Sequence, residues 1–386
     1  MKSSTETPLS AGPSHRIPSL DGLRAISIAI VLAAHAAETQ NLRFEPYSHA
    51  LYGFGAFGVK VFFVISGFLI TTLLLNEERK RGRISIGMFY FRRTFRIWPV
   101  AYTYILVVAL MSVFGLAQIP KHNLIYALTF TMNHEQNGAW ITGHLWSLAV
   151  EEQFYLVWPL VFLLTSYRGR VIACTSIVVA APLLRIGTLL YAPGVFNAMQ
   201  SSLLYLGDAI AIGCLLALFA GKLSKSKRAK RFFESRLFFL VPIMAVAMYA
   251  TLQSNLWPKF HFAIGNTISL LCVAAVIWRV ISWQDWATRI LNSRVFVFVG
   301  ILSYSLYVWQ QIFLDESGRF WINRFPQNLV LAFLAAAFSY YVVETPFLRL
   351  RERLSSRLRA RRAAPRLPES DSLVGGHPRP VDQVAS

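Results

Sequence analysis

The chain has 386 residues, of which 55% are hydrophobic and only 15% are charged, and its formal net charge is +19. A soluble domain usually carries about 25% charged residues, so this composition favours a membrane protein over a soluble one. The basic excess is then read as the positive-inside bias of membrane proteins, and no nucleic acid is expected as a partner. Three cysteines in separate apolar segments predict neither a disulfide framework nor a metal site.

The first apolar run covers residues 20–37 and follows a polar stretch, 1–16, which predicts a disordered tail. Arg16, Arg24 and the segment Ala34-His35-Ala36 also resemble a signal peptide with its cleavage site. Further apolar runs lie at 54–76, 97–117, 145–166, 171–191, 199–220, 237–253, 261–281, 295–314 and 327–347. About twenty apolar residues cross a bilayer as a helix, so the runs predict an all-α polytopic bundle of about ten spans.

Loop charges give this bundle an orientation. A shorter apolar run at 123–132 is too brief to cross and predicts an interfacial or re-entrant piece. With the N-terminus inside, most of the 38 Lys and Arg residues fall in inner segments. The outer segments hold only Arg43, Lys121, Lys259, Arg319 and Arg324. This asymmetry predicts that both termini are cytoplasmic.

The C-terminal segment differs from the transmembrane domain, which we place at 17–348. Residues 349–386 begin with closely spaced arginines, which predict a basic helix on the inner surface that attracts anionic lipid. Beyond Pro365 the composition predicts disorder. We expect a multi-pass membrane protein.

Ionisable residues inside the spans are costly and are therefore candidates for function. The first span carries Asp21, Arg24 and His35. Arg24 and His35 are eleven residues apart, so a helix places them on one face and roughly 16 Å apart along its axis. A snorkelling arginine and a structural histidine would explain the same spacing.

The fourth span carries two adjacent carboxylates, Glu151 and Glu152, seven and eight residues after His144. His144 and Glu151 share a helix face, and Glu151 is expected at about the depth of His35. A neutral histidine beside a carboxylate is a common general base. Two adjacent carboxylates are expected to face different surroundings, one of them a polar cavity.

A basic cluster and a small-residue segment complete the candidates. Arg93 and Arg96 stand at i and i+3, and they serve either as positive-inside charge or as a phosphate site. Ser66 lies in a segment of small residues that close helix packing also explains. Lys60 is expected near the outer end, where its side chain can snorkel.

Together these segments resemble the acyltransferase 3 family of membrane-bound acyltransferases over about residues 17–348. The resemblance is carried by several motifs in order: Ile17 to Ile26 with His35, Gly58 to Thr71, Phe89 to Pro99, His144 to Tyr155, Leu302 to Tyr307 and Val343 to Pro346. Each motif alone is moderately specific, and their number and order make the set strongly specific.

The resemblance implies an O-acyltransferase that moves an acyl group, commonly acetyl, from acyl-CoA to a carbohydrate or glycolipid such as a polysaccharide, lipopolysaccharide or peptidoglycan. Acyl-CoA would be a substrate, with no bound cofactor, and the membrane would be a bacterial cell (inner) membrane. Arg24 and His35 match the family's arginine–histidine pattern, and Arg93 and Arg96 match its basic pair. Some members carry a secreted hydrolase-like domain. We expect the membrane domain here to act alone or with a separate partner, and a homodimer is left open.

These features predict a mechanism across the membrane. CoA phosphates would bind near Arg24, Arg93 and Arg96, and His35 would act as general base with Glu151 orienting it. Supporting or substrate-binding roles are expected for Asp21, Ser66, His144, Trp146, Ser147, Glu152 and Tyr155. Direct transfer and a two-step route through an acyl-enzyme on His35 or Ser147 both remain open.

Two positions depart from the family pattern. Many relatives carry a histidine near Gln310, so the role of this position is left open. Lys60 stands where an acidic residue is common in the family, so the outer mouth is expected to be more cationic here. Cleavage after the first span would remove His35, so an uncleaved span is predicted.

Two alternative functions to acyl transfer are a flippase for a lipid-linked glycan and an inactive scaffold. Flippases and transporters often contain internal repeats, and the sequence shows none.

Overall fold

The computed structural model describes residues 16–39, 42, 48–195, 199–250 and 264–363. The expected disordered tails lie almost wholly outside these residues, as do the ends of the predicted runs at 237–253 and 261–281.

The described residues are predominantly helical and include no strand. The longer helices are α1 (Pro18–Ala36), α2 (Ser48–Arg81), α3 (Ile86–Val113), α6 (Leu145–Leu164), α7 (Tyr167–Tyr191), α9 (Leu203–Lys225), α11 (Leu240–Ala250), α13 (Asn266–Ser282), α15 (Arg294–Phe313), α16 (Gln327–Ser339) and α17 (Thr345–Ala363). The shorter elements are α4 (Lys121–Leu128), η2 (Met132–His134), α5 (Trp140–Gly143), η3 (Pro193–Val195), α10 (Lys227–Glu234), η4 (Arg236–Phe239), α14 (Trp286–Leu291), η6 (Trp321–Asn323) and η7 (Tyr340–Glu344).

Eight helical segments are long and apolar enough to cross a membrane. A ninth is available if α10 and the segment Arg236–Ala250, bent by 67°, count as one span, and α13 is a shorter apolar helix of 17 residues. Each of the ten predicted apolar runs therefore falls on a helix of the described chain, and the prediction of an all-α multi-pass membrane bundle is confirmed.

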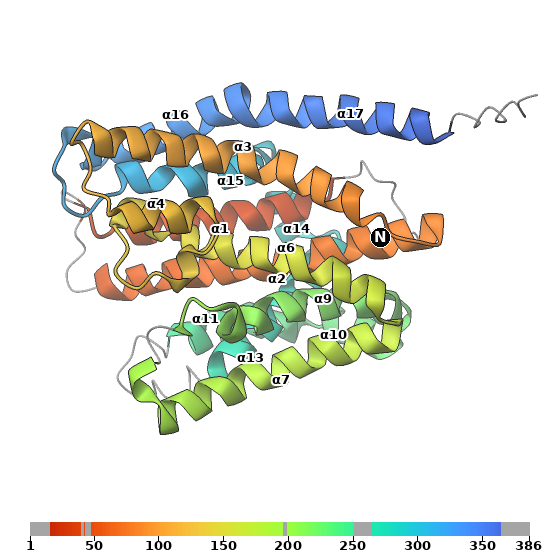
Figure 1. Cartoon of the computed structure of the whole chain (residues 1–386). Coiled ribbons are helices and arrows are strands. Elements are labelled where there is room, and N and C mark those ends of the chain that lie inside the picture. Colours follow the sequence, from red (N-terminus) through yellow and green to blue (C-terminus); the bar gives the residue numbers. More distant parts are fainter. Residues whose placement is uncertain (1–15, 40–41, 43–47, 196–198, 251–263, 364–386) are drawn as a thin grey trace, which may run out of the picture.

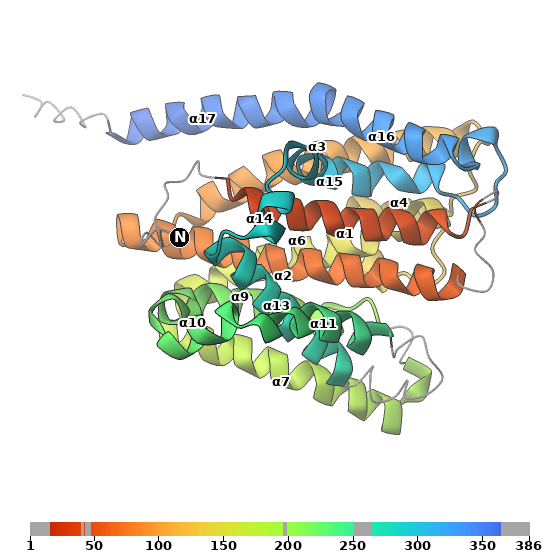
Figure 2. The same cartoon turned by 180° about the vertical axis from the view of Figure 1, so that it is seen from behind.

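Helix α1 lies between α2 and α15 and forms the centre of the bundle (Figures 1 and 2). On its far side, α2 packs against α9, which joins a second group formed with α7, α11 and α13. We call the end at which α1 begins and α2 ends, on the right in Figure 1, the inner end. The opposite end is the outer end.

Glycines allow the central helices to approach closely. A Cβ atom on Gly213 of α9 would lie 2.1 Å from the carbonyl oxygen of Val64 in α2, and one on Gly300 of α15 would lie 1.9 Å from that of Asp21 in α1. Small residues of this kind are typical of packed membrane helices, in which van der Waals contact replaces the hydrophobic drive of water.

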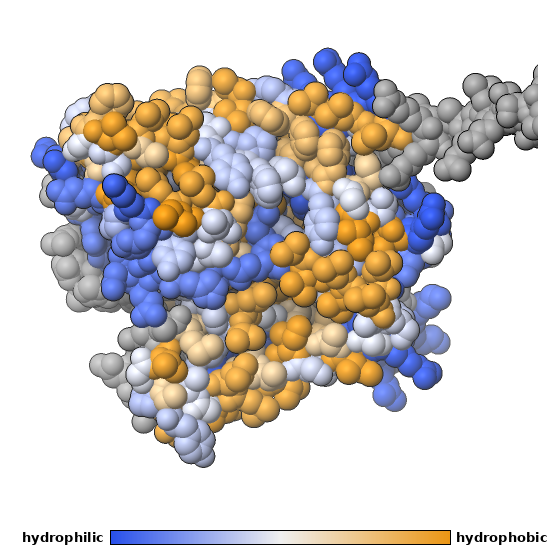
Figure 3. All heavy atoms as spheres, in the orientation of Figure 1, coloured by the Kyte–Doolittle hydropathy of each residue, from blue (hydrophilic) through white to orange (hydrophobic). Residues whose placement is uncertain are grey.

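The surface of the bundle is apolar where lipid would cover it. Exposed aliphatic residues line α6 and α7, including Leu163, Leu164, Ile172 and Leu183. Figure 3 shows hydrophobic residues over much of this face, with hydrophilic residues at both the inner and the outer end of the helices.

One boundary differs from the sequence prediction. Helix α3 begins at Ile86, well before the apolar run at 97–117, because its first three turns are basic and aromatic but still helical. The basic segment from residue 349 is helical as predicted, and it belongs to α17, which ends at Ala363. The run at 123–132 yields only the short helix α4, which is too short to cross.

Candidate active site

His35 lies near the outer end of α1, against helix α15. Its Nδ1 atom is 2.8 Å from Oε1 of Gln310, and its ring meets the Trp140 ring edge to face at 5.2 Å. Gln310 is completely buried. The imidazole is therefore held from two sides inside the membrane.

A second histidine lies beside this group. His144, at the junction of α5 and α6, places Nε2 3.0 Å from the carbonyl oxygen of Val308 in α15. Its ring is flanked by Tyr104 and Tyr307 at 5.3 and 5.5 Å. Its Nδ1 atom is buried and has no hydrogen-bond partner among the described residues. His144 and His35 lie within electrostatic range of each other.

Ser147 and Trp146 stand one turn further along α6. The Ser147 hydroxyl lies 2.6 Å from the Tyr307 hydroxyl, which also donates to the His144 carbonyl at 2.8 Å. Trp146 packs edge to face on Phe63 of α2. Both residues thus line the same part of the bundle as His144, and Ser147 is engaged in a hydrogen bond that joins α6 to α15.

The predicted basic residues come together near the inner end. Arg24 of α1 lies within electrostatic range of Arg96, Asp21, Glu151 and Glu344. Arg93 and Arg96 both project from α3, and the Arg93 guanidinium stacks 5.5 Å from the centre of the Tyr155 ring. We call Arg24, Arg93 and Arg96 the arginine cluster.

The arginine cluster keeps many of its hydrogen-bond donors unused. Arg24 makes one long ion pair, 3.9 Å, with Asp21, which also pairs with Arg16 at 3.3 Å. Within the described chain, neither Arg93 nor Arg96 makes a hydrogen bond or a close ion pair. Each guanidinium has five donors in a planar fork that matches phosphate.

Carboxylates surround the cluster without saturating it. Glu151 accepts hydrogen bonds from Ser66 at 2.7 Å and from Tyr155 at 3.3 Å. Glu344 is buried in the π-helical turn η7 and accepts from Ser305 at 3.1 Å. π-Helical turns are rare and are frequent at functional sites.

The structure corrects the expected partnership of His35 and Glu151. Gln310 lies 2.8 Å from Nδ1 of His35, whereas Glu151 is hydrogen-bonded to Ser66 and Tyr155 and lies with the arginine cluster. The reason is depth, because seven residues of helix carry Glu151 about 10 Å inward from His144. Tyr155 lies with the arginine cluster for the same reason, so it does not line the region around His35.

Glu152 faces a different direction from its neighbour, as expected for two adjacent carboxylates. Its Oε2 atom accepts from the Trp98 indole at 3.0 Å, on the α3 side of α6. The other oxygen, Oε1, is buried without a hydrogen-bond partner in the part of the chain that the structure describes.

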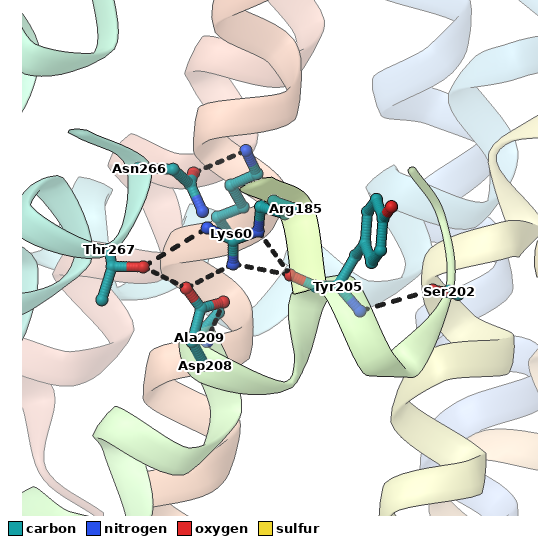
Figure 4. A network of polar contacts seen from close by, with 8 residues as sticks. All are labelled: Lys60, Arg185, Ser202, Tyr205, Asp208, Ala209, Asn266 and Thr267. Atoms are coloured by element: carbon teal, nitrogen blue, oxygen red, sulfur yellow. Dashed lines mark hydrogen bonds and ion pairs between the residues drawn. The ribbon is translucent and has the colours of Figure 1, made fainter. Parts of the chain in front are cut away.

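Lys60 lies on another face of α2, in the network of Figure 4. Its Nζ atom donates to Asn266 Oδ1 at 2.7 Å and lies 5.0 Å from the centre of the Tyr249 ring. Gly55 packs against Ala34 of α1, so Lys60 is about 7 Å further inward than that level. The expectation of a snorkelling side chain is therefore wrong, whereas the more cationic outer mouth stays a prediction.

The rest of this network, which we call the Asp208 network, was not anticipated from the sequence. Arg185 of α7 forms a short ion pair with Asp208 of α9, and both side chains are almost fully buried. Arg185 also donates to the Tyr205 carbonyl, and Asp208 accepts from Thr267 at 2.6 Å and from the Ala209 amide at 2.9 Å (Figure 4).

Several residues around His35 have no counterpart among the predicted site residues. They are Tyr104, Trp140, Tyr307, Gln310 and Gln311, and Glu344 joins them at the inner end. Glu344 carried a usable signal, because an acidic residue inside a span is a candidate for function. Tyr307 stood in a matched motif and Gln310 at a departure from the family pattern, but neither signal assigned a role, since the roles of the aromatic and amide residues depend on which helices meet.

A family model described as an acyltransferase domain (Acyl_transf_3) matches residues 17–345. A Staphylococcus aureus (strain COL) protein, provisionally named an O-acetyltransferase, is 29% identical over 86% of this chain and 57% of its own length. The peptidoglycan O-acetyltransferase OatA of Listeria monocytogenes (strain EGD-e) is 28% identical over 86% of this chain and 55% of its own.

An O-acetyltransferase OatA of Staphylococcus aureus (strain NCTC 8325) is 27% identical, again over 86% of this chain and 57% of its own length. The chain thus spans a little over half the length of these curated relatives. No solved structure matches the chain.

Proposed function

The chain belongs to the acyltransferase domain family, and we propose that it is a membrane-bound O-acyltransferase with cytoplasmic acyl-CoA as donor. The acyl group, acetyl in the simplest case, passes to a hydroxyl of an extracytoplasmic or lipid-linked carbohydrate. The bilayer is the bacterial cell membrane, or the inner membrane where the cell has two.

One observation carries this proposal: a single unbroken helix, α1, joins the two halves of the site. Arg24 lies in the arginine cluster, and His35 lies with His144, Trp140, Tyr307 and Gln310, which we call the outer group. The eleven residues from Arg24 to His35 correspond to about 16 Å along α1. An acyl-CoA with its phosphates at the inner end could extend its pantetheine arm along α1 toward His35.

The donor end suits a polyphosphate. The arginine cluster combines three positive charges with donors that no other described residue uses. Guanidinium–phosphate contacts are charge-assisted and often bidentate, so they supply both affinity and orientation. Glu151 and Glu344 would hold the guanidinium groups in place when no phosphate is bound.

The acceptor end suits proton transfer. His35 accepts the proton of the attacking hydroxyl while the oxygen bonds to the thioester carbonyl carbon. The carbon–sulfur bond then breaks, and the departing thiolate takes the proton from His35. A positioned general base contributes typically about 10²–10⁴-fold to such a reaction.

The acceptor class is proposed from the relatives. The printed name of the Listeria monocytogenes relative assigns it peptidoglycan O-acetylation. We extend a carbohydrate acceptor to this chain, with direct transfer and transfer through an acyl-enzyme as the two routes to be distinguished. Trapping labelled acyl-protein after mixing with donor alone would establish the second route.

The proposal is tested with purified protein in detergent, [¹⁴C]acetyl-CoA and a panel of glycans that includes muropeptides and neutral oligosaccharides. We expect label on at least one glycan, with release of free CoA thiol in equal amount. Movement of a lipid-linked glycan across liposomes without any acetyl transfer would overturn the proposal and favour a flippase.

A further inference from the structure

Helix α15 presents hydrogen-bond acceptors to both histidines of the outer group. The Val308 carbonyl faces Nε2 of His144, and the Gln310 side chain faces Nδ1 of His35. A neutral imidazole carries its single proton on the nitrogen that faces an acceptor. One helix thus determines which nitrogen of each ring keeps a lone pair.

The Gln310 amide is itself oriented by its neighbour. Its Nε2 atom donates to Oε1 of Gln311 at 2.9 Å, which turns its own Oε1 toward His35. Both amides are buried, with exposed fractions of 0% and 3%. Since an amide oxygen only accepts, the proton in the bond to His35 belongs to Nδ1.

Trp140 prevents the His35 ring from turning away. Its indole packs edge to face on the imidazole at 5.2 Å, and its Nε1 atom donates to the Gln311 carbonyl at 3.2 Å. The residues that orient the amide and the residue that confines the ring are therefore connected to each other.

We propose that Gln310 is a positioning residue that holds His35 in the Nδ1–H form and leaves Nε2 as the proton acceptor in catalysis. This inference rests on the proposed function and assigns the atom that performs it. Nε2 takes the hydroxyl proton as the oxygen–carbon bond forms, and the imidazolium keeps its Nδ1–H bond to Gln310. Nε2 then gives the proton to the leaving thiolate.

His144 provides an internal contrast. Its Nε2 atom faces an acceptor, so its lone pair lies on Nδ1, which is buried without a partner among the described residues. The two rings therefore hold opposite forms, although they lie within electrostatic range of each other. His144 is also the titratable group that must be considered when the pH dependence of His35 is measured.

The direct test is solid-state NMR of protein labelled with [¹⁵N]histidine in lipid bilayers, with His35 assigned by comparison with His35→Gln. We expect a protonated Nδ1 and an unprotonated Nε2 at neutral pH. In Gln310→Met the single form should be lost. A protonated Nε2 in the wild type would overturn the inference, and this readout does not depend on any enzymatic activity.

Kinetics of two Gln310 variants supply the second test. Gln310→Met removes the acceptor at similar volume, and we expect kcat to fall about 10²-fold, less than the ~10⁴-fold for an ionised orienting group. Gln310→Glu keeps the acceptor and should retain activity within about tenfold. For Gln310→Glu, the acid limb of the pH profile of kcat/KM should move to higher pH, because a carboxylate stabilises the imidazolium form of His35.

The matched control is Gln153→Met, which removes another amide that is hydrogen-bonded inside the bundle, to Asn133 and the Phe130 carbonyl. We expect this variant to lose stability without a change in the pH profile. Equal losses in all three variants, with unshifted pH profiles, would show that Gln310 has only a structural role. Absence of transfer by the wild type would instead reject the proposed function.

Discussion

Two polar groups lie buried in this bundle, and they differ in how completely they are satisfied. In the Asp208 network, both carboxylate oxygens accept hydrogen bonds, from Arg185, Thr267 and the Ala209 amide. In the outer group around His35, the Gln310 side chain faces Nδ1 of His35 and the Val308 carbonyl faces Nε2 of His144, whose Nδ1 atom is buried without a partner among the described residues.

This difference distinguishes groups that stabilise the fold from groups that are available for catalysis or substrate binding. A buried ion pair whose carboxylate oxygens both accept hydrogen bonds joins helices, here α7, α9 and α13. A lone pair left without a partner, or a guanidinium with unused donors as in the arginine cluster, is available to a substrate. Charge inside the membrane alone is therefore a weaker guide to the active site than incomplete satisfaction.

The largest effect is expected at His35. His35→Ala should lower kcat about 10²–10⁴-fold, because a positioned base is lost. Binding of acetyl-CoA and thermal stability should change little, since the arginine cluster lies about 16 Å away. Steady-state kinetics measures kcat, and isothermal titration calorimetry measures the binding of acetyl-CoA. Substantial turnover by this variant would show that His35 is not the catalytic base.

The Asp208 network should show the opposite pattern. Asp208→Leu leaves Arg185 as an uncompensated buried charge, and we expect a loss of about 3 kcal/mol in the free energy of unfolding. The double variant Arg185→Leu with Asp208→Leu should recover part of this loss. Unfolding in mixed detergent micelles measures both, and a specific activity per folded molecule that fell as far as for His35→Ala would break the distinction.

The arginine cluster should affect donor binding rather than chemistry. Arg93→Gln removes charge-assisted contacts to phosphate, each worth about 1.5–3 kcal/mol, so KM for acetyl-CoA should rise about 10–100-fold. Arg168→Gln is the control, because it removes an equal charge from an exposed position at the inner end of α7. Equal KM values for the two variants would contradict a specific phosphate site.

The smallest effect concerns packing between α2 and α9. Gly213→Ala places a Cβ atom 2.1 Å from the Val64 carbonyl oxygen, and we expect a loss of about 1–3 kcal/mol in stability. Gly221→Ala on the same helix meets nothing within 4 Å and should be neutral or slightly stabilising. The difference in unfolding free energy between the two variants measures the contact.

Much of the architecture can be predicted from the sequence, because the length and apolar composition of a run identify it as a membrane span. The first turns of α3 escape this signal, since Arg92, Arg93 and Arg96 interrupt the apolar pattern without breaking the helix. The bend between α10 and the following segment falls at Ser235, whose extended backbone ends α10 and whose side chain caps η4, and apolar periodicity does not report such a junction.

In the candidate site, only the relative positions of residues on the same helix can be predicted from the sequence. Arg24 and His35 could be related by helical geometry, because both stand on α1. The pairing of His35 with Gln310 joins residues 275 positions apart, and nothing in either local pattern predicts it. The depths of Lys60 and Glu151 were misjudged for the same reason, since depth depends on how neighbouring helices align.

Transfer across the membrane is tested most directly by sidedness. Protein is reconstituted in one orientation into sealed liposomes, with [¹⁴C]acetyl-CoA supplied only at the inner end of the bundle and the glycan acceptor only at the outer end. We expect labelled glycan from the wild type, none from His35→Ala, and CoA thiol released on the donor side. Transfer that occurs only when donor and acceptor share one side would contradict a path along α1 from the arginine cluster to His35.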